Sequence, residues 1–329
     1  MRTVYRIATL VAVLAWSVPA ATGAQRTNGS GALALMVAEF ERSYVSTADL
    51  RGTGPDLHFE ANIAPPFFLA SPDWRTALVA TPKVVLRMFD SHSAPVRTPS
   101  YMPRLTFYYF PREALAKAVS EHSEASFVEL TLSHHSNGQD GPQLNPDGSV
   151  NHLDGSFSTN FLEITYASSF LSDAPFVRML PRGVRRAFAH VRYSYEWHLP
   201  RSPDMANRLE YSISRVHVAS GGVFPVNTDP GAACVVAWRV RWNECLRDVY
   251  VAYRVTYLSG RVAERFRGRG RFPVSANVGL TPTFSRDVSF YVEYVSGQDY
   301  YNTYFDRSLN ALRIGMRANR GAEPERTAP

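Results

Sequence analysis

Phe127-Val-Glu-Leu-Thr-Leu-Ser-His134-His135-Ser136-Asn137-Gly138, together with Ser156-Phe-Ser-Thr-Asn160-Phe-Leu-Glu-Ile-Thr-Tyr166, decides the fold. In both segments apolar and polar side chains alternate with a period of two, which predicts β-strands with one apolar and one polar face. His134, Ser136 and Asn160 nevertheless fall on the apolar parity of their strands. If the two strands are antiparallel neighbours, these polar side chains share one otherwise apolar face.

The same alternation recurs along the chain in segments of about ten residues, and the chain contains 17 tyrosines and 19 phenylalanines. These features are typical of an outer-membrane barrel, although a soluble all-β protein can look similar. We therefore predict an all-β fold, a twelve-stranded antiparallel transmembrane β-barrel. Its predicted strands are 43–47, 57–64, 82–90, 104–112, 126–136, 160–171, 187–198, 207–218, 248–258, 272–282, 288–296 and 308–318.

The N-terminus has the pattern of a secretory signal peptide: Arg2 and Arg6, a short apolar run at 7–16, and small residues up to Ala24. We predict a signal peptide at 1–24, a single barrel domain at 25–318 and a tail at 319–329. The predicted location is the bacterial outer membrane. Without Arg2 and Arg6 the formal charge falls from +6 to +4, which gives no ground to expect a nucleic-acid partner.

Cys234 and Cys245 lie close together in a chain predicted to be exported, and a disulfide is expected there. Free thiols are the alternative. A fully extended segment would separate these cysteines by roughly 35 Å, far more than the roughly 4.4–6.8 Å between bridged Cα atoms. We therefore predict that 219–246 is an insertion between strands.

Strand parity also predicts topology. If the N-terminus is periplasmic, the loops 91–103, 137–159, 199–206 and 297–307 are extracellular and the cysteine insertion is periplasmic. The apolar parity then faces lipid, so His134, Ser136 and Asn160 lie on the outer wall. His135 faces the interior and forms hydrogen bonds there, and the interior also receives Glu129, Thr131, Glu163 and Thr165.

His134-x-Ser136-Asn137-Gly138 followed by Ser156-x-Ser-x-Asn160 resembles the active-site signature of outer membrane phospholipase A. The loop from Ser93 to Pro103 is also similar to that family, as are Ser296-Gly297, Tyr301-Asn302 and Arg307 or Arg313. The resemblance extends from about residue 40 to 318. It implies a calcium-dependent phospholipase A1/A2 that acts as a homodimer on phospholipids, cutting acyl esters at the sn-1 and sn-2 positions.

The resemblance also implies roles for individual residues. Ser136 corresponds to the nucleophile, His134 to the general base and Asn160 to the residue that orients the imidazole. The backbone N–H of Gly138 is the expected oxyanion donor.

For Ca²⁺, which prefers hard oxygen ligands, the resemblance implies the Ser156 hydroxyl and the Gln139 backbone carbonyl from one subunit and Ser93 from the second copy. Asp204 is a weaker candidate, because it follows a proline and can equally brace a turn.

Two features depart from the family pattern or lie outside it. The interval between Ser136 and Asn160 is about twelve residues longer than expected, with the excess near 141–154. A cluster of arginines at 265, 267, 269 and 271 is either a solvated loop or a contact for anionic lipopolysaccharide. The alternative functions are a structural or narrow-pore outer-membrane barrel and a soluble secreted esterase.

Overall fold

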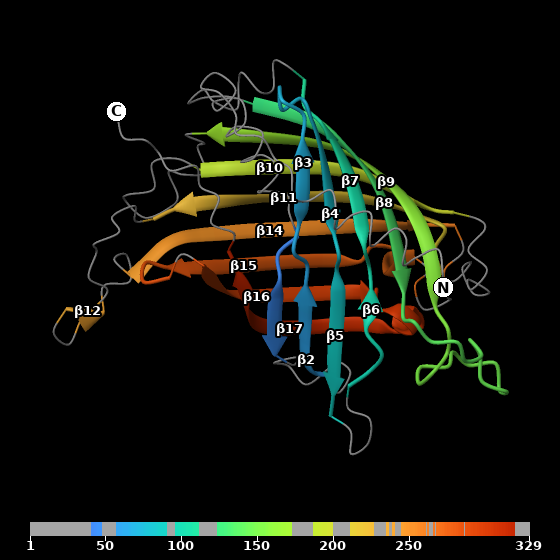
Figure 1. The fold of residues 1–329 in the computed structure, drawn as a ribbon. Coiled ribbons are helices and arrows are strands. Elements are labelled where there is room, and N and C mark those ends of the chain that lie inside the picture. Colours follow the sequence, from blue (N-terminus) through green and yellow to red (C-terminus); the bar gives the residue numbers. More distant parts are fainter. Residues whose placement is uncertain are drawn as a thin grey trace.

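The computed structural model describes residues 41–47, 57–90, 96–111, 124–172, 187–199, 211–226, 235–236, 239–240, 245–260, 262, 266, 268–285 and 287–319. They form a closed, twelve-stranded antiparallel barrel, as predicted (Figure 1). Pairing of β8 with β9 closes the sheet. No helix in these residues is long and apolar enough to cross a membrane.

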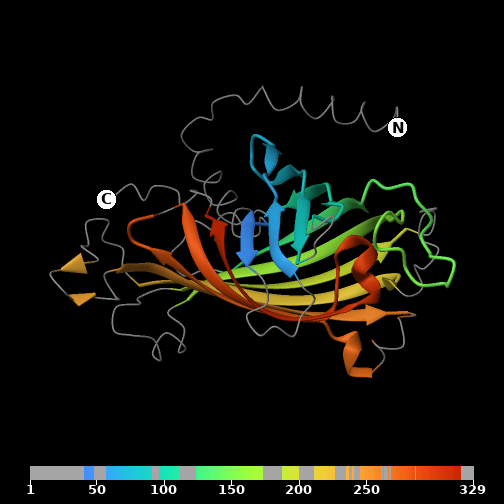
Figure 2. The same ribbon diagram turned by 90° about the horizontal axis from the view of Figure 1, so that it is seen from below.

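Eight strands, most of them long, form one side of the barrel, and each is hydrogen-bonded to the next (Figure 2). All eight have the nine residues or more that a membrane-crossing strand needs. They are β8 (Glu124–Ser136), β9 (Ser158–Ser172), β10 (Ala187–His198), β11 (Ser214–Pro225), β14 (Leu246–Ser259), β15 (Val274–Pro282), β16 (Val288–Gln298) and β17 (Ser308–Ala318).

The other side is built from shorter pieces: β1 (Tyr44–Thr47), β2 (Leu57–Ile63), β3 (Phe67–Ala70), β4 (Thr76–Thr81), β5 (Val84–Phe89), β6 (Ser100–Tyr101) and β7 (Arg104–Tyr109). β2 with β3, β4 with β5, and β6 with β7 each make one interrupted barrel strand. Every interruption contains proline, at positions 65–66, 82 and 103. Proline has no N–H for the ladder, so the sheet breaks at the same level in three adjacent strands.

Two 3-10 helices, η3 (Gly268–Arg271) and η4 (Asn302–Asp306), lie in the connections between strands. A separate hairpin, β12 (Val235–Val236) and β13 (Arg239–Val240), follows β11. Cys245 is disulfide-bonded, while Cys234, the predicted signal peptide and the predicted tail beyond 319 lie outside the described residues.

Strand limits differ most from prediction at β11, which spans Ser214–Pro225 where 207–218 was predicted. Gly221 and Gly222 look like a loop in the sequence, yet they pair with β10 and β14. A Cβ at Gly221 would press on the Val251 carbonyl and the His190 ring, so glycine is what allows the close packing there. The predicted insertion at 219–246 is therefore shorter: β11 continues to Pro225 and β14 begins at Leu246.

Side chains divide between the two faces as parity predicts. Leu130, Leu132 and Ile164 are exposed on the outer surface, whereas Glu129 and Thr165 are buried inside. Several of the interior charges form ion pairs.

These pairs join neighbouring parts of the inner wall. Glu60 binds Arg87 at 2.6 Å and Arg313 at 2.9 Å, and Arg87 also binds Asp299. These ion pairs connect β2, β5 and β17 with the connection after β16.

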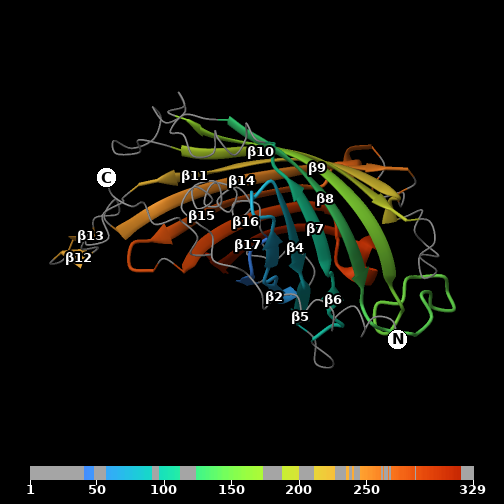
Figure 3. The same cartoon turned by 45° about the horizontal axis from the view of Figure 1, so that its top comes forward.

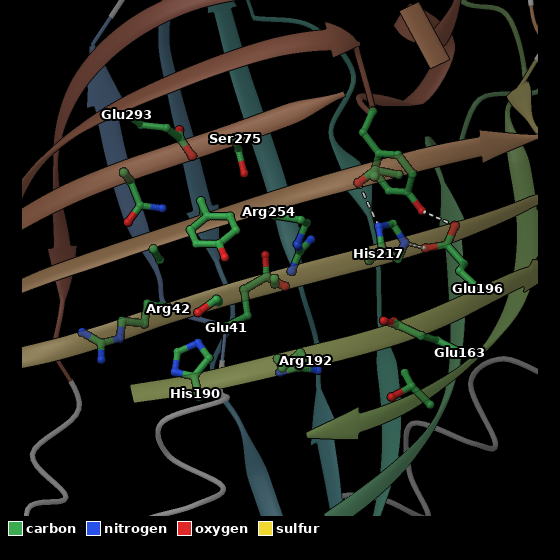
Figure 4. Close-up of a pocket in the computed structure, with 18 of the residues that line it drawn as sticks. Glu41, Arg42, Glu163, His190, Arg192, Glu196, His217, Arg254, Ser275 and Glu293 are labelled. Carbon is green, nitrogen blue, oxygen red and sulfur yellow. Dashed lines mark hydrogen bonds and ion pairs between the residues drawn. The ribbon is translucent and has the colours of Figure 1, made fainter. Parts of the chain in front are cut away.

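The interior is only partly filled. A cavity of about 560 Å³ lies inside the barrel, lined by charged side chains that include Glu41, Arg192, Glu196, Arg254 and Glu293 (Figure 4). Glu129, Thr131 and Thr165 thus lie buried inside the barrel as predicted, while the centre of the barrel stays open.

Candidate functional site

The candidate site lies on the outer wall where β8 ends and β9 begins. His134 pairs with Asn160, and Ser136 pairs with Ser158. The Nδ1 atom of His134 lies 2.8 Å from Asn160 Oδ1. His134, Ser136 and Asn160 are all half-buried on the outward parity. The three residues thus share the face that the sequence predicts for them.

Ser136 and His134 are two residues apart on this face, about 7 Å along the strand. The Ser136 hydroxyl has no hydrogen-bond partner among the described residues. A hydroxymethyl group and an imidazole can bridge this spacing, and such contacts are often loose before substrate binds.

Gly138 follows Ser136 by two residues and has a φ of +71°, a conformation that favours glycine. A Cβ there would touch the ring of Tyr101, 3.5 Å away. Among the described residues the N–H of Gly138 makes no hydrogen bond, whereas the N–H of Gln139 donates to Asn137 Oδ1. An unused backbone donor therefore lies beside Ser136.

The side chain of Asn137 holds the two ends of the following loop together. Its Nδ2 donates to the Gly155 carbonyl at 2.7 Å, and its Oδ1 accepts from the N–H groups of Phe157 and Gln139. This buried amide fixes the backbone on both sides of the 137–157 connection.

The extra residues at 141–154 form a closed loop, which we call the extension, with a narrow base (green in Figure 3). Gly141 and Gly155 form a bridge at this base, and Gly141 exchanges hydrogen bonds with Asp154 and Ser156. A Cβ at either glycine would collide with a backbone carbonyl. The loop is thus closed at its base, and the ends of β8 and β9 stay paired at Ser136 and Ser158.

The extension also contacts η4. His152 Nε2 lies 3.4 Å from Asp306 Oδ1 and accepts a hydrogen bond from Arg307 Nε at 3.2 Å. The His152 ring packs 4.7 Å from that of Tyr304. The connection after β16 therefore supports the extension.

Behind the outer face, the intervening residues point inward and form hydrogen bonds. His135 is 0% exposed and contacts Tyr211 Oη and Ser100 Oγ, as predicted for an interior histidine. Thr159 Oγ1 lies 2.8 Å from His198 Nδ1, and His198 Nε2 lies 2.7 Å from Glu196. Thr159, His198 and Glu196 were not predicted from the sequence. Their inward-facing positions on the strands could have indicated that they support the site from inside the barrel.

Aromatic rings pack against this inner layer, where the Tyr211 ring contacts that of His198. The Arg215 guanidinium lies between the rings of Tyr211 and Tyr300, 4.3 and 4.2 Å from their centroids, and Phe305 packs on Tyr211. Burial raises the pKa of Tyr211 to about 12, and burial with the nearby Glu196 carboxylate raises the pKa of Tyr300 well above its ordinary value. Both phenols therefore stay protonated in the packed end of the barrel.

The described residues contain part of the predicted calcium set. Ser156 and Gln139 lie next to the base of the extension, where the N–H of Ser156 donates to the Gly141 carbonyl at 2.9 Å. Both offer hard oxygen atoms, which fit Ca²⁺. Ser93 and Asp204 lie outside the described residues. Within the described residues, no group of three or more His, Cys, Asp or Glu side chains could hold a metal.

Of the four arginines at 265, 267, 269 and 271, expected to be either a solvated loop or a contact for lipopolysaccharide, Arg271 is placed most fully. Its guanidinium donates to the carbonyl oxygens of Leu258 and Gly260, so it braces the turn after β14. Arg265 and Arg267 lie outside the described residues, and only the backbone of Arg269 is described.

Comparison with known proteins shows similarity in structure alone, because no protein-family model and no curated protein sequence matches this chain. Outer membrane phospholipase A from Escherichia coli is 12% identical with a TM-score of 0.51, covering 88% of this chain and 98% of the enzyme. An active-site mutant of that enzyme gives a TM-score of 0.52 over the same shares, again at 12% identity. A calcium-bound outer membrane phospholipase dimer from Salmonella typhi is also 12% identical, with a TM-score of 0.48, covering 85% and 90% of the two chains. The chain therefore shares the fold of an outer-membrane barrel.

Proposed function

We propose that this protein is an outer-membrane phospholipase that hydrolyses sn-1 and sn-2 acyl esters of phospholipids and lysophospholipids. The observation that carries the proposal is the 2.8 Å contact between His134 and Asn160 on a face that also bears Ser136. Polar groups on a lipid-facing wall are costly and need a function. A hydrolytic site on such a wall meets its substrate directly in the membrane.

The proposed chemistry follows from the imidazole's orientation. Asn160 Oδ1 is an acceptor, so His134 Nδ1 carries the proton and Nε2 keeps its lone pair. Nε2 then takes the Ser136 hydroxyl proton as Oγ attacks the ester carbonyl. Asn160 is neutral, so it fixes the tautomer and gives the imidazolium no ionic stabilisation.

The N–H of Gly138 would donate to the oxyanion of the tetrahedral intermediate, and one such donor is typically worth about 2.7–4 kcal/mol. The imidazolium returns its proton to the departing glycerol oxygen as the ester bond breaks. Water then attacks the acyl-serine as His134 takes its proton, and the imidazolium returns that proton to the leaving Ser136 Oγ, which releases the fatty acid.

Calcium is part of the proposal. Ser156 and the Gln139 carbonyl would hold the ion together with Ser93 of a second copy, with Asp204 as a weaker further ligand. When bound, Ca²⁺ supplies Lewis-acid polarisation of the substrate carbonyl. The proposed active form is accordingly a homodimer in the outer membrane, with phospholipid as substrate and lipopolysaccharide as a neighbour.

The experiment is fatty-acid release by the mature chain refolded in detergent, with calcium and with chelator. We expect calcium-dependent release from the wild type and none above background from Ser136→Ala. Ser158→Ala is the matched control, since Ser158 pairs with Ser136 on the neighbouring strand. Release that survives chelation would retain the serine hydrolase and refute the calcium assignment.

A narrow pore is the second candidate, favoured by the charged cavity inside the barrel. The aromatic packing of Tyr211, Tyr300 and Phe305 at one end argues against an open path. Absence of hydrolysis by a folded wild-type barrel, combined with conductance in planar bilayers, would overturn the enzyme proposal in favour of the pore.

A further inference from the structure

The two-residue strand β6 lies directly beside the candidate site. Tyr101 of this strand pairs with Ser136 of β8, so the two side chains project from the same face of the sheet. The Tyr101 ring also lies over Gly138, because a Cβ built on this glycine would be 3.5 Å from the ring atom Cε2. The ring therefore occupies one side of the residue whose N–H is the proposed oxyanion donor.

Residues 97–102, which contain β6 and which we call the strap, are tied to the neighbouring chain at both ends. The N–H of Arg97 donates to the Arg87 carbonyl at 3.1 Å. The N–H of Met102 donates to the Lys83 carbonyl at 2.8 Å. These bonds fix the ends of the strap to β5 and to the residue before it.

The middle of the strap is held at Thr98 by side chains from elsewhere in the chain. The Thr98 carbonyl accepts hydrogen bonds from Tyr301 Oη and Asn302 Nδ2, both at 2.9 Å. These two bonds use both lone pairs of the carbonyl oxygen. The Thr98 hydroxyl accepts a third bond from Gln139 Nε2 at 3.2 Å. Thr98 thus connects η4 with the segment that follows Ser136.

The backbone of Asn302 is unusual. Its φ is +27°, which is uncommon for a residue other than glycine. Its Oδ1 accepts hydrogen bonds from the N–H and the hydroxyl of Thr303. Such conformations persist where the surroundings fix them, and they cluster at functional sites. Tyr301-Asn302 is also one of the segments that resemble the phospholipase family, and the proposed chemistry gives this pair no role.

We propose that Tyr301 and Asn302 are positioning residues for the oxyanion donor. They fix Thr98 and so hold the strap, which in turn keeps the Tyr101 ring against Gly138. Glycine has a freely variable backbone, and an oxyanion donor must be aimed before the reaction begins. Both η4 side chains are buried, so they act through the strap and not by contact with substrate. This inference rests on the proposed phospholipase function.

The test measures kcat and KM for fatty-acid release at saturating calcium by wild type, Tyr301→Phe and Asn302→Asp. Tyr301→Phe keeps the ring and removes one hydrogen bond. Asn302→Asp keeps the acceptor for Thr303 and tolerates positive φ, but it loses the donor to the strap. Since loss of a whole oxyanion donor costs about 10²–10³ in kcat, we expect each variant to lower kcat per folded molecule about three- to tenfold, with KM unchanged.

Thr281→Val is the matched control for a lost buried hydrogen bond. Thr281 Oγ1 lies 2.8 Å from Ser289 Oγ inside the opposite end of the barrel. This variant should lower stability and leave kcat per folded molecule unchanged. An equal fall of kcat in the control, or an unchanged kcat in both η4 variants, would overturn the positioning role and retain the phospholipase. An inactive but folded wild type would overturn both.

A double-mutant cycle tests whether Tyr301 acts through the Tyr101 ring. If it does, the double variant Tyr101→Ala with Tyr301→Phe should be no slower than Tyr101→Ala alone, because the ring that Tyr301 positions is already absent. Losses that multiply in the double variant would contradict this route.

Discussion

His134 and His135 are adjacent in the chain and differ in almost every physical respect. His134 is half-buried on the outer wall, and its side chain forms a hydrogen bond with Asn160. His135 is inside the barrel with Tyr211 and Ser100 as partners, and its ring packs against that of Phe157. Strand parity alone separates them, since successive residues point to opposite faces.

The same division recurs one strand away. Asn160 points outward toward His134, whereas Thr159 points inward toward His198. The outer residues keep polar atoms available, and the inner residues use theirs to join neighbouring strands. The comparison indicates that reactivity and rigidity belong to alternate positions of the same two strands.

The largest expected effect separates the two histidines. His134→Ala should lower phospholipid hydrolysis by roughly 10²–10⁴-fold through loss of the general base, with the stability of the barrel unchanged. His135→Ala should cost about 3 kcal/mol of unfolding free energy, since it opens a cavity and leaves buried partners unpaired. The measurements are fatty-acid release per folded molecule and denaturant unfolding in detergent.

Each variant is the other's control in this pair. Similar loss of stability in both would contradict the separation of the two faces. Full activity in folded His134→Ala would remove that residue from the proposed site.

A smaller effect is expected at the next pair. Asn160→Ala should reduce activity roughly ten- to a hundredfold, because a hydrogen bond to the charged imidazole is worth about 1.5–3 kcal/mol. Thr159→Val keeps the shape but deprives His198 of a partner, so it should lower stability by about 1–3 kcal/mol and leave activity per folded molecule nearly unchanged. Fatty-acid release and denaturant unfolding, measured on both variants, check this. A larger loss of activity in Thr159→Val than in Asn160→Ala would contradict the division between outer and inner residues.

Much of the fold was predictable because alternation in long strands has a direct physical cause. The limits of β10 and β17 agree with prediction at both ends. Prediction was poorer where glycine or proline lies inside a strand. Gly221 and Gly222 are paired within β11, and the proline breaks in β2–β7 divide strands that the sequence shows only in part.

The outer residues of the candidate site were predictable by motif and parity, whereas their inner supports were not. Thr159 and His198 are 39 residues apart in the chain, and only the register of β9 with β10 brings them together. The same applies to His152, which meets Asp306 through the folding of the extension. Such contacts depend on three-dimensional closure and leave no local pattern in the sequence.

The smallest expected effect concerns the extension, and it tests whether this loop belongs with the outer residues of the candidate site or with the structural residues inside the barrel. Gly155→Ala would place a Cβ against the Asn151 carbonyl and disturb the base beside Ser156, whereas Gly148→Asn alters an open turn whose φ of +82° asparagine tolerates. If the base positions Ser156 and Gln139 for calcium, Gly155→Ala should raise the calcium concentration for half-maximal activity a few-fold, and Gly148→Asn should not. Calcium titrations of fatty-acid release measure this. Equal responses in the two variants would place the extension with the structural residues, because a loop that merely packs on η4 has no effect on the metal dependence.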